Sequence, residues 1–330
     1  MTPLIDTFAR RITYLRLSVT DRCDLRCVYC MPERMTFLPK ADVLSLEELR
    51  ALALGFIDRG VRKIRLTGGE PLVRRDVLDL VRALGREVGR GLDELTLTTN
   101  GMRLAEHAAA LADAGVRRIN VSLDTRDRAL FARLARRDGL LHVLAGIAAA
   151  KAVGIEVKLN TVALKGLNED ELPSLIVWAH GEGHAITLIE VMPLGDVDGD
   201  RFDHYLPLNA VRRALEQCLT LSPSSHRSGG PARYFDVAET GGRLGLITPL
   251  TNNFCEGCNR VRVTATGQLF MCLGGEGQVD LRAALRGGEA GAFDAALDRA
   301  TQLKPERHAF AIDRPGAAPA LARHMSMTGG

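Results

Sequence analysis

Residues 14–30 read Tyr14-Leu-Arg-Leu-Ser-Val-Thr-Asp-Arg-Cys-Asp-Leu-Arg-Cys-Val-Tyr-Cys30, in which a strand-like run leads into a cysteine-rich loop. The first part, Tyr14–Val19, is short and largely aliphatic, as a buried strand is. The loop carries Cys23, Cys27 and Cys30 with the spacing C-x3-C-x2-C. Thiolates are soft ligands that favour zinc, copper(I) or an iron–sulfur cluster. The stretch therefore predicts a strand whose end carries a metal-binding loop.

This strand-then-loop pattern repeats along the first 195 residues. The expected strands are Tyr14–Val19, Lys63–Thr67, Glu94–Thr99, Arg118–Leu123, Glu156–Val162 and Ala185–Val191. The amphipathic segments between them are Ser45–Arg59, Arg74–Val88, Arg103–Ala114, Arg128–Ala135 with Leu140–Val153, and Asp170–His180. Ser45 followed by Glu48 is a capping box that marks one helix start. We therefore predict an α/β fold, a partial (β/α)6 TIM-type barrel, with its chemistry at the carboxyl ends of the strands.

The pattern changes from about residue 196 onward. Asp196–Asp203 is expected to be a loop, and Ser222–Pro231 is a connector rich in Ser, Gly and Pro. Short strand-like pieces follow at Arg243–Thr248 and Val261–Thr264. We predict a barrel domain over residues 1–221 and a smaller C-terminal domain over residues 222–330. The smaller domain would pack on the open side of the barrel and carry a second group of cysteines.

The composition indicates a globular protein and argues against nucleic-acid and membrane partners. Hydrophobic residues make up 46% of the 330 residues and charged residues 25%, which is ordinary for a globular protein. The formal net charge of +3 is too small to imply a nucleic-acid partner. No apolar run approaches the roughly 20 residues of a membrane helix, and the first residues show no secretory signal. We expect a cytoplasmic protein with neither a membrane nor a nucleic-acid partner.

The seven cysteines indicate metal binding, because an odd number in a cytosolic chain argues against a disulfide framework. Cys218, in the helix-like run Ala210–Leu219, is expected to be an inert buried thiol. The other six form two groups. The first group holds only three thiols, which would leave one iron of a four-iron–four-sulfur (4Fe–4S) cube open to a chelating molecule. A zinc site with a distant fourth ligand is the alternative.

The second group is Cys255-Glu-Gly-Cys258 with Cys272, a C-x2-C-x13-C spacing. A lone C-x2-C is usually a zinc site, but no fourth cysteine stands near it. The nearest histidines, His226 and His308, are expected to be surface or structural residues. A second three-cysteine cluster, with an iron open to substrate, fits this group better than zinc.

A set of cations points to an anionic ligand. Arg16, Arg65 and Lys158 lie within expected barrel strands, where a charge is costly unless it is paired. Arg260 and Arg262 share one face of a later strand. Carboxylates on the covering helices could pair with any one of these cations. All five together indicate a polyanionic substrate such as a nucleoside triphosphate, since the guanidinium fork suits phosphate.

The cysteine loop, with an aromatic residue before its last cysteine, resembles that of the radical S-adenosylmethionine (SAM) superfamily, and Gly68-Gly-Glu-Pro71 resembles its GGE motif. Within the superfamily, nearly the whole chain resembles the GTP 3',8-cyclases, which begin molybdenum cofactor (molybdopterin) biosynthesis. The stretches that carry this resemblance are Tyr14–Asp21, Ile64–Asp76, Thr98–Gly101, Ile119–Asp124, Asn160–Val162, Ile189–Met192, Phe254–Arg262, Cys272–Gly277 and Met327–Gly330. The second cysteine group and the Gly-Gly end distinguish this family best from other members of the superfamily, which share the first cysteine loop.

The resemblance implies roles for particular residues. It implies one 4Fe–4S cluster on Cys23, Cys27 and Cys30 and a second on Cys255, Cys258 and Cys272. The residues implied to bind SAM are Tyr29, Gly69, Ser122 and Met192. Those implied to bind GTP are Arg16, Arg65, Thr98, Lys158, Arg260, Val261 and Arg262. The implied catalytic set is Cys23, Cys27, Cys30, Arg260, Arg262 and the terminal Gly329 and Gly330, which reach into the active site.

The resemblance also implies the reaction. Reductive cleavage of SAM gives a radical that removes hydrogen from C3' of GTP, and C3' then attacks C8 of guanine. The product is (8S)-3',8-cyclo-7,8-dihydroguanosine 5'-triphosphate. The implied partners are a flavodoxin- or ferredoxin-like one-electron reductant and a downstream molybdopterin-pathway enzyme. The family often forms homodimers, although no feature of the sequence demands one. The competing hypotheses are a peptide-modifying radical enzyme and a zinc-stabilised RNA-binding protein.

Overall fold

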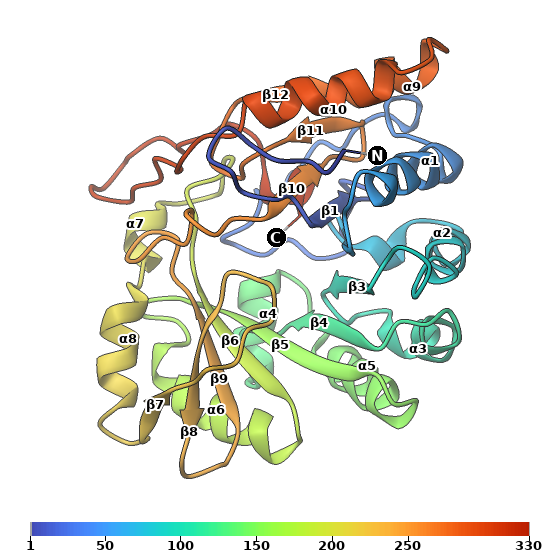
Figure 1. Ribbon diagram of the computed structural model, residues 1–330. Coiled ribbons are helices and arrows are strands. Elements are labelled where there is room, and N and C mark those ends of the chain that lie inside the picture. The colour runs from blue at the N-terminus through green and yellow to red at the C-terminus, as the bar shows by residue number, and fades with distance from the viewer. Residues whose placement is uncertain (1, 330) are drawn as a thin grey trace.

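The computed structural model describes residues 2–329, which fold around one continuous sheet (Figure 1). Over this range the sheet has twelve strands in the order β12-β11-β10-β1-β2-β3-β4-β5-β6-β9-β8-β7. The six central strands are parallel neighbours: β1 (Tyr14–Ser18), β2 (Lys63–Thr67), β3 (Glu94–Thr99), β4 (Arg118–Ser122), β5 (Glu156–Ala163) and β6 (Ala185–Glu190). They are the six strands expected from the sequence, so the predicted α/β partial barrel is confirmed.

Helices cover the outer side of these strands (Figure 1). They are α1 (Leu46–Asp58), α2 (Val77–Gly85), α3 (Leu104–Asp113), α4 (Arg128–Ala135), α5 (Leu140–Ala152) and α6 (Leu172–Gly181), with short 3-10 turns at η1 (Lys40–Asp42), η2 (Pro71–Val73) and η3 (Glu169–Glu171). The predicted capping box starts α1: the Ser45 hydroxyl accepts from the Glu48 N–H at 3.1 Å, and the Glu48 carboxylate accepts from the Ser45 N–H at 2.8 Å. Outward-facing strand residues such as Leu15 and Leu66 are fully buried in the core.

The C-terminal third of the chain extends both edges of the barrel sheet. Its elements are α7 (Arg201–His204), α8 (Leu208–Leu215), β7 (Leu221–Pro223), β8 (Arg233–Val237), β9 (Arg243–Ile247), β10 (Arg260–Val263), β11 (Gln268–Phe270), β12 (Gln278–Asp280), α9 (Leu281–Arg286), α10 (Ala292–Gln302) and α11 (Met325–Thr328). Strand β9 pairs in parallel with β6, and β10 pairs in parallel with β1. The two C-terminal strands expected from the sequence are therefore present. The division between residues 221 and 222 stays a prediction.

Two expectations from this region need correction. Cys218 is exposed, so the prediction of a buried thiol is wrong. Helix α8 ends at Leu215, and Cys218 follows it in a turn, where its thiol reaches only the Leu215 carbonyl at 3.4 Å. The expected loop Asp196–Asp203 contains the start of the short helix α7, where the Asp200 carboxylate accepts from the Phe202 N–H at 2.9 Å.

Strand register gathers the cations that the sequence singled out. Arg16 on β1 lies opposite Arg65 on β2 and opposite Arg262 on β10. Lys158 on β5 lies opposite Asn120 on β4. Since side chains alternate along a strand, these residues share the lumen side of the sheet while their neighbours face the helices. None of the helices within residues 2–329 has the length and apolar character to cross a membrane.

Candidate active site

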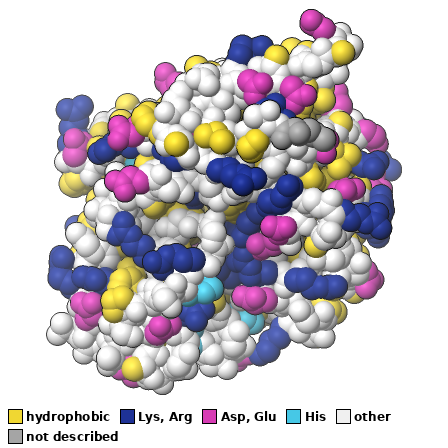
Figure 2. All heavy atoms as spheres, in the orientation of Figure 1, with side chains coloured by type: hydrophobic (Ala, Val, Ile, Leu, Met, Phe, Trp, Pro, Cys, Tyr) yellow, Lys and Arg dark blue, Asp and Glu magenta, His cyan; other side chains and the backbone are white. Residues whose placement is uncertain are grey.

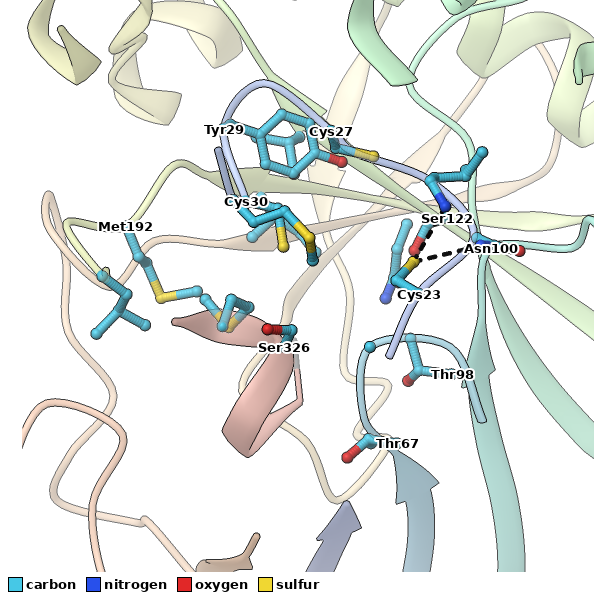
Figure 3. A pocket seen from close by; sticks show the side chains of 18 of the residues that line it. Cys23, Cys27, Tyr29, Cys30, Thr67, Thr98, Asn100, Ser122, Met192 and Ser326 are labelled. Carbon is cyan, nitrogen blue, oxygen red and sulfur yellow. Dashed lines mark hydrogen bonds between the residues drawn. The ribbon is translucent and has the colours of Figure 1, made fainter. Parts of the chain in front are cut away.

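The three cysteines of the first group line one cavity at the carboxyl ends of the barrel strands. Every residue implied to bind SAM lines the same cavity, namely Tyr29, Gly69, Ser122 and Met192. Figure 3 shows Cys23, Cys27 and Cys30 on the loop after β1, with Met192 across the cavity from them. Residues separated by up to 169 positions in the sequence, Cys23 and Met192, are thus brought together by the barrel.

The loop after β2 lies directly against the cysteine loop. The Gly69 N–H donates to the Thr20 carbonyl at 2.9 Å, and the Glu70 N–H donates to the Arg22 carbonyl at 2.8 Å. A Cβ atom at position 69 would lie 2.3 Å from the Arg22 carbonyl oxygen, so only glycine allows this approach. The two loops therefore form one unit that fixes the edge of the cavity.

A buried hydrogen-bond network behind this edge reaches the first cysteine. The Glu70 carboxylate accepts from the Asn100 N–H at 2.6 Å and from the Thr99 hydroxyl at 2.9 Å. The Asn100 side-chain amide donates to Asp24 at 2.6 Å and lies 3.7 Å from the Cys23 sulfur (Figure 3). Burial raises the pKa of Glu70 to about 7, although these hydrogen bonds oppose the shift.

The three cysteines of the first group are half-buried, and the surroundings of their thiols disfavour the charged thiolate. Burial, reinforced by the charge of Glu70, raises the pKa of Cys23 to about 12, and burial raises the pKa of Cys30 to about 11. A bound cation would reverse this preference, because metal-bound thiols are deprotonated. Among residues 2–329, no three Cys, His, Asp or Glu side chains converge as ligands of one ion do. Three soft thiols around one cavity fit a 4Fe–4S cube, whose irons take separate thiolates.

A second cavity brings the predicted cations together with the second cysteine group. Its lining includes Arg16, Arg65, Lys158, Arg260, Arg262, Cys255, Cys258 and Cys272, with Lys63 and Arg118 at its edge. No carboxylate stands among the described residues that line it. Lys and Arg side chains also gather around a recess in the middle of the face shown in Figure 2. A cavity of this kind suits a polyanion.

The cations in this second cavity repel one another. Burial, followed by the charge of Arg262, lowers the pKa of Arg16 well below its usual value. Burial and the charges of Arg65 and Arg118 lower the pKa of Lys158 to about 7. In the described part of the chain, Arg16, Arg65 and Lys158 make no ion pair within 4 Å, so the alternative of carboxylates on covering helices does not hold. A bound anion would relieve the repulsion.

Two residues implied to bind GTP lie elsewhere. Thr98 lines the first cavity, and its buried hydroxyl has no hydrogen-bond partner in the described range. The Val261 side chain is 1% exposed and belongs to the hydrophobic core, between Arg260 and Arg262 on the opposite face of β10. The Val261 side chain therefore faces the core and not the second cavity.

Lys304 contacts the segments that carry the second cysteine group, and nothing in the sequence predicted this role. It is 2% exposed, and its ammonium donates to the Met271 carbonyl at 2.6 Å and the Arg260 carbonyl at 2.9 Å. It also lies 3.6 Å from the Cys258 sulfur. Burial opposes ionisation of Cys258, but Arg260 and Lys304 outweigh it and lower the pKa of that thiol to about 7.

The side chains of two arginines donate hydrogen bonds to the main-chain carbonyls of the other two cysteines of this group. Arg10 forms a buried ion pair with Asp6 at 2.6 Å and donates to the Cys255 carbonyl at 2.8 Å. Arg323 donates to the Cys272 carbonyl at 3.4 Å. These contacts join segments from both ends of the chain to the cysteine loops. The sequence alone does not reveal them, because isolated basic residues in irregular segments have no characteristic spacing.

The two cavities meet inside the barrel. Asn160, Ile189 and Met192 line both of them. Helix α11, near the end of the chain, contributes Met325 and Ser326 to the first cavity, and Figure 3 shows Ser326 facing the cysteine loop. A molecule in one cavity could therefore touch a molecule in the other without crossing solvent.

The residue after α11 sits against strand β2. Gly329 has a φ of +73°, and a Cβ atom there would lie 2.0 Å from the Thr67 hydroxyl oxygen. Arg262 donates to the carbonyl of Thr328 at 3.1 Å and also to that of Gly329. Gly329 thus lies against Thr67, which lines the first cavity, and accepts from Arg262, which lines the second. Gly330, the other member of the expected pair, lies outside the described residues.

Comparison with known proteins identifies the family. The model of the Radical SAM superfamily matches residues 17–179, and the model Molybdenum Cofactor Synthesis C matches residues 184–310. The GTP 3',8-cyclase of Erythrobacter litoralis is 71% identical over 328 residues, which cover 99% of this chain and 98% of that one. The GTP 3',8-cyclase of Rhizobium meliloti is 61% identical over 330 residues, which cover 99% and 95% of the two chains.

Solved structures support the fold. The crystal structure of Streptococcus suis SuiB bound to S-adenosylmethionine superposes with a TM-score of 0.59 at 15% identity, covering 82% of this chain and 63% of that one. Such a low identity is informative about architecture alone. With the identity to curated cyclases extending over nearly the whole length, the chain belongs to the GTP 3',8-cyclase family of radical SAM enzymes.

Proposed function

We propose that this chain converts GTP to (8S)-3',8-cyclo-7,8-dihydroguanosine 5'-triphosphate, the first step of molybdenum cofactor biosynthesis. The observation that carries the proposal is the meeting of a three-thiol cavity and a seven-cation cavity along Asn160, Ile189 and Met192. When bound, the first of the enzyme's two 4Fe–4S clusters supplies the electron that cleaves SAM and starts radical chemistry on GTP. The residues of the barrel bind, orient and enclose the two molecules.

The first cavity is assigned to the cluster and SAM. Cys23, Cys27 and Cys30 would hold three irons, and the main chain at Gly69 would face the amino group of SAM. Tyr29, Ser122 and Met192 would line the rest of that molecule. The support is that all of these residues face one cavity and that the loops bearing Gly69 and Cys23 are hydrogen-bonded to each other.

The second cavity is assigned to GTP. Arg16, Arg65, Lys158, Arg260 and Arg262 would bind the triphosphate, whose negative charge offsets their mutual repulsion. Thr98 would contact the nucleotide from the border of the first cavity, and Val261 would do so through its main chain. The cluster on Cys255, Cys258 and Cys272 would offer its open iron to the guanine.

Positioning is the protein's main contribution to catalysis. Holding C3' of the ribose beside the cleavage product of SAM replaces a random encounter by a fixed one. Burial of the lumen excludes water that would quench radicals. Gly329 and Gly330 would close the junction between the cavities, which is supported by the contact of Gly329 with Thr67. Arg262 would hold this tail while it faces the nucleotide.

We also propose the wider setting of the reaction. A flavodoxin- or ferredoxin-like protein would supply electrons, and a downstream molybdopterin-pathway enzyme would receive the product. The seven free cysteines favour a reducing, cytoplasmic environment. Residues 1–221 would form the radical SAM partial barrel, and residues 222–330 the smaller domain that carries the second cluster and the Gly-Gly end. A homodimer is compatible with this arrangement.

The test is anaerobic incubation of the reconstituted enzyme with GTP, SAM and dithionite. The expected result is one cyclised guanine nucleotide for each 5'-deoxyadenosine. The matched control is Cys218→Ser, which alters an exposed cysteine outside both groups and should keep full activity. Formation of 5'-deoxyadenosine only when a peptide is present, with no nucleotide product, would favour a peptide-modifying enzyme.

A further inference from the structure

Lys158 is held by a tyrosine that the proposed function does not use. The Lys158 ammonium is buried, at 7% exposure, and donates to the phenol oxygen of Tyr234 at 2.6 Å. The ammonium nitrogen also lies 4.9 Å from the centre of the Tyr234 ring. Tyr234 is 4% exposed and stands behind Lys158, outside the set of described residues that line the GTP cavity. The hydroxyl of Tyr234 therefore reaches the cavity only through the lining residues that it contacts among those described, Lys158 and Ser228.

The Tyr234 hydroxyl has a defined orientation because it donates a hydrogen bond of its own. Tyr234 donates from its hydroxyl to the Ser228 hydroxyl oxygen at 2.8 Å. Ser228 lines the GTP cavity, and its carbonyl accepts from the Lys63 ammonium at 3.3 Å. With its proton directed to Ser228, the phenol oxygen presents its lone pairs to Lys158. The segment that covers the cavity and the lysine inside it are thus connected by one tyrosine.

The local backbone is shaped to accept this ring. Tyr234 on β8 lies opposite Gly245 on β9. A Cβ atom at position 245 would lie 3.1 Å from the Tyr234 ring and 2.6 Å from the Thr187 hydroxyl oxygen. The absence of a side chain at Gly245 therefore leaves room for the Tyr234 ring to extend over β9 toward Lys158.

The charges around Lys158 explain why a neutral acceptor is needed. The charged groups that face it are Arg65 and Lys63 on β2, Arg118 on β4 and Glu156 on β5. The three cations repel its ammonium, although Glu94 on β3 pairs with Lys63 at 2.6 Å and with Arg118 at 2.5 Å. Glu156 is an exposed residue at the start of the strand. A carboxylate at the place of the phenol would fix Lys158 but would compete with phosphate for it. A phenol fixes the ammonium and leaves its charge available.

We propose that Tyr234 is a positioning residue for GTP binding, which holds the Lys158 ammonium in place for the triphosphate without neutralising it. The inference rests on the proposed assignment of the second cavity to GTP. It predicts that removal of one oxygen atom, which does not touch the nucleotide, weakens nucleotide binding through Lys158 alone. Turnover at saturating GTP should change little, because no reacting atom is displaced.

The experiment is a double-mutant cycle on the cluster-loaded protein, measured as equilibrium GTP binding in the absence of SAM. Tyr234→Phe should raise the Kd for GTP about tenfold, the usual effect of losing a hydrogen bond to a charged group. Lys158→Met should raise it further. The double variant should bind no more weakly than Lys158→Met, because the tyrosine acts only through the lysine. Tyr205→Phe, a phenol outside both cavities, is the matched control and should bind like the wild type.

The pH profile separates positioning from a general structural defect. Without the phenol oxygen, the charged form of Lys158 loses a partner, so the loss of GTP affinity with rising pH should begin at lower pH in Tyr234→Phe. If this variant fails to fold, Ser228→Ala, which frees the phenol to rotate, should weaken binding in the same direction. An unchanged Kd and pH profile in Tyr234→Phe would overturn the proposal. So would a double variant whose loss of GTP affinity equals the product of the two single losses. Absence of GTP binding by the wild type would instead refute the proposed function.

Discussion

Arg262 donates a hydrogen bond to the carbonyl oxygen of Thr328 at 3.1 Å, so a cation of the nucleotide cavity also holds the last helix of the chain. Both residues are buried, Arg262 at 9% and Thr328 at 1% exposure. Arg262 lies opposite Arg16 across the β10–β1 pair. The tail is therefore fixed by the same residue that is assigned to the triphosphate, which links closure of the junction to occupancy of the nucleotide cavity.

Gly329→Ala tests this closure. The added methyl group would lie 2.0 Å from the Thr67 hydroxyl oxygen at a backbone φ of +73°, so the tail must leave its place. We expect formation of the cyclised nucleotide to fall by about tenfold or more, while both clusters remain. Gly316→Ala is the matched control, because its φ is +67° and nothing lies within 4 Å of the added methyl group. Equal activity of the two variants would contradict the role of the tail.

GTP binding should weaken as the pH rises. Burial and neighbouring cations lower the pKa of Lys158 to about 7 in the free enzyme. A bound triphosphate would raise this pKa, because an opposite charge favours the ammonium. Below this pKa the Lys158 side chain is already charged when GTP binds. Above this pKa the neutral amine must take up a proton as GTP binds. Between pH of about 7.5 and 9, where the triphosphate is fully ionised, we expect the Kd to rise by up to about tenfold per pH unit.

Equilibrium dialysis with labelled GTP measures this dependence, and Lys158→Met supplies its control. The variant should bind weakly but with little change over the same pH range. A slope that persists in Lys158→Met would assign the titration to another group.

Lys304→Met tests the support of the second cysteine group. The substitution leaves the carbonyls of Met271 and Arg260 without their donor, so we expect the metal-free protein to lose about 1–3 kcal/mol of unfolding free energy in urea. We also expect the loaded protein to lose iron to a chelator severalfold faster. Lys40→Met replaces an exposed lysine and should change neither quantity. Iron retention equal to that of the wild type would refute the role of Lys304.

Cys218 should be the fast-reacting thiol of the loaded protein. It is exposed, whereas the other six cysteines are buried or half-buried and assigned to clusters. One equivalent of iodoacetamide should label Cys218 while GTP cyclisation continues unchanged, as peptide mass spectrometry would show. Preferential labelling of Cys23 or Cys258 would mean that their cluster is absent or loosely held.

The features that depend on regular spacing could be predicted from the sequence. Short runs rich in aliphatic and β-branched residues, each followed by a turn signal, predicted all six barrel strands, and the Ser45 capping box marked the start of α1. The lumen position of Arg16, Arg65 and Lys158 followed from the period of a strand. These patterns are local, so one sequence is enough to detect them.

The features that depend on contacts between distant segments could not be predicted. Lys304 and Tyr234 reach Cys258 and Lys158 only because the C-terminal strands join both edges of the barrel. Strands β7, β8, β11 and β12 were not predicted, and β7 overlaps the segment that was expected to be a connector. Cys218 was placed in a helix that ends three residues earlier, because helix ends are the least certain part of a periodic pattern.

Two separate three-cysteine groups should each hold a 4Fe–4S cluster, and iron and sulfide analysis of anaerobically purified protein counts the clusters. The wild type should contain about eight irons and eight sulfides per chain, and each triple alanine variant, at positions 23, 27 and 30 or at positions 255, 258 and 272, about four of each. Stoichiometric zinc without sulfide, or a variant that keeps the full iron content, would contradict the account.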